Sequence, residues 1–172
     1  MKNILLHIER YLNILEKVLA YISLAIASIV MLMITADVMM RYLFRKPIIG
    51  VFELSEFAMV GIVFLGVAYV QSIKGHVNVP ILIEKLSPKT QASLTIFGYL
   101  LGFASLSIIT WASASATWTA FVTGDYAMGI IHFPTWPAKL SVPLGLSVLN
   151  IRLIIDILKD CQRLRSGHEP RV

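Results

Sequence analysis

The chain has 172 residues, of which 57% are hydrophobic and only 15% charged, and its mean hydropathy is +0.77. Soluble domains are about half apolar and about a quarter charged, so this composition argues against a water-soluble enzyme fold. The net charge of +5 comes from basic residues at the edges of apolar runs, where lipid headgroups would meet them. We therefore predict a membrane protein with no nucleic-acid partner. The single cysteine, Cys161, excludes an internal disulfide framework.

Residues 1–17 have the pattern of an amphipathic helix, with apolar side chains on one side and polar and charged side chains on the other. We expect this segment to lie in the headgroup region.

The next run, residues 18–40, is long enough for a first membrane span, because a helix needs about 20 residues to cross the hydrocarbon core. A signal peptide is the alternative, but this run exceeds the length of its apolar core and no clear cleavage site follows. We expect the segment to be retained.

Three further apolar runs predict three more spans. The second span covers residues 48–73, with its helix starting near Pro47, because proline is favoured in a first turn. The third covers residues 90–121, and its helix is expected to begin at Pro88, with Ser87 as the N-cap residue. The fourth covers residues 138–158, although Arg152 and Asp156 interrupt its inner end.

The remaining segments are a link and a tail. The link over residues 74–89 contains a second amphipathic piece over residues 80–86, and the tail over residues 159–172 is polar and expected to fray. The predicted fold is therefore an all-α integral membrane protein with four transmembrane helices and an N-terminal amphipathic interfacial helix, in a single membrane domain over residues 1–172.

Basic residues in the flanks predict the orientation of the spans, because cytoplasmic flanks carry more lysine and arginine. With the N-terminus inside, eleven basic residues lie on the inner side and four on the outer side, the outer ones being Arg41, Arg45, Lys46 and Lys139. We therefore predict that both termini, the link and the tail are cytoplasmic.

The spans hold few groups that could carry chemistry. Their middle thirds are almost entirely apolar, whereas a transporter or channel that works alone usually shows ionisable or broken-helix positions near the midplane. The histidines lie in flanks or loops, which leaves no paired axial ligands for a buried haem. No phosphate loop, metal-spaced cluster or nucleophile motif is present. We predict no catalytic residue, no metal site and no cofactor, and we do not expect an enzyme.

Two groups of residues are candidates for a partner interface. The first is a GxxxG pair in the third span, because small side chains let helices approach closely in lipid. Its contact is either with neighbouring helices of the same chain or with another subunit. The second is a charged cluster at the outer hairpin, which is either a self-contained network or partly turned toward a partner protein. The seven candidates are Gly98 and Gly102, then Asp37, Arg41, Arg45, Glu53 and Glu56.

Several short motifs occur in a characteristic order. They are Asp37-Val-Met-Met-Arg41-Tyr42-Leu-Phe44, Pro47, Glu53-Leu-Ser-Glu56, Phe64-Leu-Gly66 with Ala68, Gly75-His76-Val77-x-Val79, Phe133-Pro134-x-Trp136-Pro137 and Pro143-x-Gly145. In order and spacing the chain resembles the small membrane subunit of tripartite ATP-independent periplasmic (TRAP) transporters, the DctQ-like family. One departure is Pro80, where the resemblance leads us to expect an acidic residue.

The resemblance implies a sodium-coupled symporter of three parts in the bacterial inner membrane. These are a periplasmic substrate-binding protein, a large DctM-like subunit that moves organic acids by an elevator motion, and this small subunit as a fixed scaffold. The substrate and ion sites would then lie on the partners. The alternative from another class is a self-sufficient small tetraspan carrier or channel that acts as a homo-oligomer.

Overall fold

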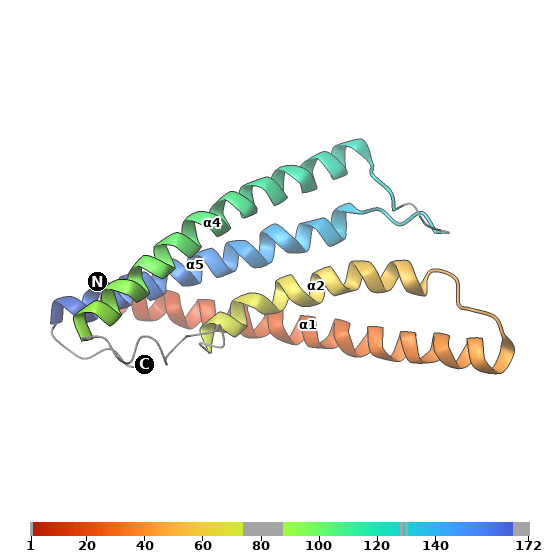
Figure 1. The fold of residues 1–172 in the computed structure, drawn as a ribbon, viewed down its shortest axis with the longest axis horizontal. Helices are drawn as coiled ribbons and strands as arrows, with labels where there is room; N and C mark the ends of the chain where they lie inside the picture. Colours follow the sequence, from red (N-terminus) through yellow and green to blue (C-terminus); the bar gives the residue numbers. More distant parts are fainter. Residues whose placement is uncertain (1, 74–87, 128, 130, 167–172) are drawn as a thin grey trace.

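The computed structural model describes residues 2–73, 88–127, 129 and 131–166 (Figure 1). Its helices are α1 (Lys2–Phe44), α2 (Val51–Ser72), α4 (Pro88–Thr123) and α5 (Trp136–Ser166). Within the described ranges there is no β-strand, only an isolated bridge between Tyr126 and Pro134 in the connection from α4 to α5. All four helices contain a segment long and apolar enough to cross a membrane. The predicted all-α fold with four spans is confirmed.

Helix α1 is one uninterrupted helix of 43 residues. We expected a separate surface helix over residues 1–17 ahead of the first span, and the structure instead continues one into the other. The physical reason is that no glycine or proline interrupts the sequence between Lys2 and Phe44. At about 1.5 Å per residue, α1 is roughly twice as long as the hydrocarbon core is thick, so it extends beyond that core. The place of its first turns in the headgroup region stays a prediction.

Helix α2 begins at Val51, three residues later than expected, so Pro47 is not in its first turn. The chain leaves α1 through Arg45, whose φ is 52°, and enters α2 through Gly50, whose φ is 89°. Left-handed φ values break a helix, and Gly50 adopts one without steric cost. A Cβ at Gly50 would also overlap the side chain of Ile131, so this position requires glycine on two grounds.

Helix α4 begins at Pro88 as expected and ends close to the predicted boundary, just before Gly124 with its φ of 66°. Helix α5 is longer than predicted, because it starts at Trp136 and continues through Pro143 to Ser166. Residues 159–166 are therefore helical, which corrects the expectation that the tail frays there. Residues 74–87 and 167–172, with most of the predicted link, its amphipathic piece and the end of the tail, lie outside the described residues.

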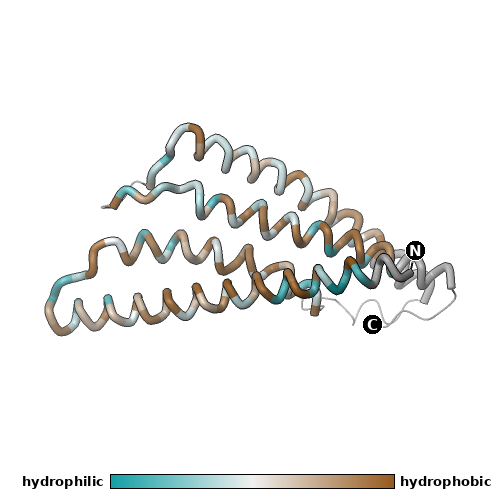
Figure 2. Tube along the Cα trace, turned by 180° about the vertical axis from the view of Figure 1, so that it is seen from behind, coloured by the Kyte–Doolittle hydropathy of each residue, from teal (hydrophilic) through white to brown (hydrophobic). Residues whose placement is uncertain are grey.

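The helices lie side by side in one row, in the order α1, α2, α5, α4 (Figures 1 and 2). The core of the row is a cluster of Ala68, Leu146 and Leu149, where α2 meets α5. At Gly145 a Cβ would overlap the carbonyl group of Phe64, so the backbones of α2 and α5 are in direct contact there. Many large apolar side chains of all four helices remain exposed on this row.

Candidate partner-binding site

The turn between α1 and α2, on the predicted outer side, is built around Asp37, which is 5% exposed. Its Oδ2 accepts a hydrogen bond from Nε of Arg41 at 2.7 Å, one helical turn away. Its Oδ1 accepts a second hydrogen bond from the backbone N–H of Ile48, also at 2.7 Å. Of the expected hairpin network, the structure contains this Asp37–Arg41 pair. Asp37 therefore holds the turn, and each of its two carboxylate oxygens accepts a hydrogen bond from within the chain.

The other charged candidates are not gathered into that network. Arg45 and Glu56 are exposed, and within the described part of the chain no ion pair joins either of them to another residue. Glu53 is half-buried beneath the connection from α4 to α5, where its side chain fills the space in which a Cβ of Gly129 would lie. The same connection packs Phe133 edge-on against Phe57, with ring centroids 6.5 Å apart.

The GxxxG pair of α4 is open. A Cβ at Gly98 or at Gly102 would meet no described atom within 4 Å outside the helix, so contact with neighbouring helices of the same chain does not use these glycines. The close approaches within the chain occur elsewhere. Gly66 of α2 faces Ser23 of α1, whose hydroxyl donates a hydrogen bond to the carbonyl oxygen of Ile62 at 2.7 Å. Of the two alternatives for the α4 glycines, contact with another subunit remains as a proposal.

A buried polar cluster, which the sequence pattern did not predict, joins three helices near the ends that the predicted orientation places on the inner side. The Arg152 side chain of α5 is 8% exposed, and its Nη1 donates to Oδ1 of Asn13 at 2.7 Å. The same Nη1 lies 3.4 Å from Oε2 of Glu16, whose side chain is fully buried. Nη2 reaches the backbone oxygen of Ser72 at 3.5 Å, and Nε lies 3.4 Å from Oδ1 of Asp156.

Two more contacts extend this cluster. Nε2 of Gln71 donates to Oδ2 of Asp156 at 3.3 Å, and Lys159 pairs with Glu9 one to two turns further toward the N-terminus of α1. We call Asn13, Glu16, Gln71, Ser72, Arg152 and Asp156 the Arg152 cluster. Because it draws on α1, α2 and α5 at one level, it fixes the relative positions of three helices.

The sequence carried a signal for this cluster. Arg152 and Asp156 are four residues apart inside a span, where an unpaired charge is energetically unfavourable. We assigned Arg152 to the inner flank and Glu16 to the polar side of a surface helix, so neither was considered as a partner of the other. Their sequence separation is 136 residues, and only the packing of α5 against α1 and α2 brings them together.

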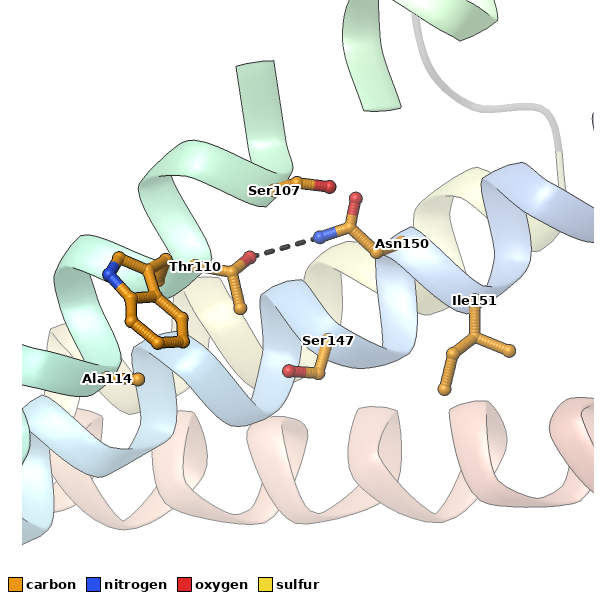
Figure 3. A pocket seen from close by; sticks show the side chains of 7 residues that line it. Ser107, Thr110, Ala114, Ser147, Asn150 and Ile151 are labelled. Carbon is orange, nitrogen blue, oxygen red and sulfur yellow. Dashed lines mark hydrogen bonds between the residues drawn. The ribbon is translucent and has the colours of Figure 1, made fainter. Parts of the chain in front are cut away.

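An open cleft of about 340 Å³ lies between α4 and α5 (Figure 3). Nδ2 of Asn150 donates to Oγ1 of Thr110 at 3.0 Å across its floor, and Ser147 lies beside them. The Oδ1 atom of Asn150 is buried and has no hydrogen-bond partner within the described part of the chain. These polar side chains lie within two spans that we expected to be almost entirely apolar there. The lining residues are Ser107, Thr110, Trp111, Ala114, Ser147, Asn150 and Ile151.

Four long apolar helices in a row define a multi-pass membrane protein. Residues 30–163 match the family described as tripartite ATP-independent periplasmic transporters, DctQ component, and the chain belongs to this family. It is also similar to the C4-dicarboxylate TRAP transporter small permease protein DctQ of Pseudomonas aeruginosa strain PAO1. The identity is 33% over 110 residues, which cover 59% of this chain and 50% of that protein. The chain thus matches about half the length of this curated relative.

Proposed function

We propose that the chain is the fixed scaffold of a sodium-coupled TRAP transporter. In this proposal it supports a large elevator-type DctM-like subunit, which takes up organic acids delivered by a periplasmic substrate-binding protein. The complex lies in the bacterial inner membrane, with both termini of the small subunit in the cytoplasm. The C4-dicarboxylates in the name of the Pseudomonas relative are one substrate class within the organic acids.

The observation that supports a scaffold best is the single row of helices tied by the Arg152 cluster. A domain that moves through the membrane needs a stationary neighbour, and helices arranged in a row leave more of their surface open to a neighbour than a compact bundle does. The buried ion pairs and hydrogen bonds of the cluster oppose sliding of α5 against α1 and α2. The row is therefore both broad and rigid at its inner end, as a scaffold must be.

Reconstitution tests this proposal. We expect liposomes that contain the chain with its large subunit, a substrate-binding protein and a sodium gradient to take up a dicarboxylate, and we expect no uptake when the large subunit is left out. Uptake by the chain alone would contradict the scaffold and support the self-sufficient carrier. A second measurement is affinity purification from native membranes, in which we expect a polytopic protein to co-purify.

A further inference from the structure

The cleft between α4 and α5 lies on the one face of α5 that its neighbouring helices leave exposed. Helix α5 sits inside the row, with α2 on one side and α4 on the other. Between residues 140 and 159 its exposed side chains all fall on a single stripe, and their spacing alternates between four and three residues. The stripe consists of Leu140, Leu144, Ser147, Ile151, Ile154 and Leu158. A central helix is thus open along one line only, and the cleft is on that line.

Helix α4 continues the same face with a matching stripe, in which the spacing again alternates between four and three. Its residues are Leu100, Ala104, Ser107, Trp111, Ala114 and Trp118, and all except the half-buried Ser107 are exposed. Alternate spacings of three and four mark the seam along which a helix packs nearly parallel to another. Small side chains line the cleft on both helices, Ser107 and Ala114 on α4 and Ser147 on α5, and they leave room for the side chains of a further helix.

The amide of Asn150 adds a chemical requirement to this shape. The residue is 9% exposed and lines the cleft. The hydroxyl of Thr110 donates its one proton to the carbonyl oxygen of Leu106, so it can only accept from Asn150. The amide nitrogen is therefore fixed toward Thr110, and Oδ1 is left without a donor. A buried carbonyl oxygen without a partner is costly, and lipid acyl chains carry no donor.

We propose that the α4–α5 cleft is the docking site for a membrane-spanning helix of the large subunit. This helix places a hydroxyl, amide or indole N–H donor over Asn150 and is otherwise apolar, because neither stripe contains an ionisable residue. The identity of the partner rests on the proposed function. The surface is distinct from the GxxxG pair, because nine residues separate Gly102 from Trp111 and turn the helix through about two and a half turns to its opposite side.

Photo-crosslinking in the co-expressed complex tests the site with a matched control. Ala114 and Ala116 are both exposed alanines of α4, but two residues turn the helix by about 200°, so only Ala114 faces the cleft. With benzophenone-bearing amino acids at each position, we expect an adduct with the large subunit from position 114 and none from position 116. An adduct only with a second copy of the chain, adducts from 116 alone, or no adduct from 114 in an intact complex would overturn the proposal.

Two variants and one control variant give a measure of the association. We expect Asn150→Leu to weaken association with the large subunit by roughly three- to tenfold, the effect of one interhelical hydrogen bond in lipid. Ala114→Trp fills the cleft and should prevent co-purification, whereas Ala116→Trp should leave it intact. A monodisperse Ala114→Trp protein that retains the large subunit would overturn the proposal even if Asn150→Leu fails to fold.

The wild-type chain separates this inference from the proposed function. If the wild-type chain retains no large subunit, both the scaffold and the docking site are wrong. If the wild type retains it and the cleft variants do so equally, the docking site alone is wrong.

Discussion

The two ends of the α1–α2 pair, inner and outer in the predicted orientation, use charge in opposite ways. At the inner end, Arg152 contacts side chains of α1 and α5 and the backbone oxygen of Ser72 in α2, and both Arg152 and Glu16 are buried. At the outer end, Asp37 is buried, but its partner Arg41 keeps 57% of its side chain exposed, and Arg45 and Glu56 face outward. The inner charges thus hold the chain together, whereas the side chains of Arg41, Arg45 and Glu56 are accessible to other molecules.

The difference teaches where a mutation should act. Removing one member of a buried cluster leaves the others in a low-dielectric environment without their partner, and this destabilises the fold. Reversing an exposed charge changes little within the chain but changes what can approach it. The variants below test this contrast, from the largest expected effect on stability to the smallest.

Arg152→Met should have the largest effect. It leaves the fully buried Glu16 carboxylate without a counter-charge, and removing one partner of a buried pair typically costs roughly 3–5 kcal/mol. We expect poor accumulation in the membrane and a strongly lowered unfolding temperature in detergent. The double variant Arg152→Met with Glu16→Leu should recover part of that loss, because it removes the unpaired charge. A single variant as stable as the wild type would show that the Arg152 cluster does not hold the helices.

Gly145→Ala should have the next largest effect. The added Cβ overlaps the carbonyl group of Phe64, so α2 and α5 must move apart, and overpacking of this kind costs roughly 1–3 kcal/mol. Gly102→Ala is the matched control, because a Cβ there meets nothing within 4 Å. Thermal unfolding of the isolated chain in detergent measures both variants. Equal losses at the two glycines would contradict the observed contact between α2 and α5.

Two substitutions at Asp37 separate its two roles. Asp37→Leu removes the charged acceptor for the backbone N–H of Ile48, with an expected loss of roughly 1–3 kcal/mol. Asp37→Asn keeps an acceptor oxygen and loses the charge opposite the half-exposed Arg41, so we expect a loss below about 1 kcal/mol. Unfolding of the isolated chain distinguishes them. If Asn is as damaging as Leu, the ion pair rather than the backbone hydrogen bond holds the turn.

Charge reversal at the exposed outer positions should have the smallest effect on stability. Arg45→Glu and Glu56→Lys should each change the stability of the isolated chain by less than about 0.5 kcal/mol. If these residues face the substrate-binding protein or the large subunit, uptake by the assembled transporter should fall, and the defect should depend on ionic strength. Normal uptake at normal expression would remove both residues from the partner interface.

Some parts of the structure could be predicted from the sequence and others could not. Span positions followed from uncharged runs, and the predicted boundaries of α2 and α4 lie within a few residues of the observed ones. The predicted break near residue 17 is absent, because a change in polarity along α1 is not a helix terminator. The Asp37–Arg41 ion pair could be predicted, because both residues lie on one helix one turn apart. The Arg152 cluster could not, since its members are dispersed over three helices.

The sequence by itself determined that this protein lies in a membrane and that it is helical. Apolar runs of span length must form helices in lipid, because only a helix satisfies its own backbone hydrogen-bonding groups there. Only the tertiary structure decided how those helices are arranged. It placed α5 between α2 and α4, buried Arg152 among partners from α1 and α2, and left Asn150 at an open cleft. The reason is that helix neighbours in lipid are chosen by shape and by a few hydrogen bonds between distant residues, and these leave no periodic pattern in the chain.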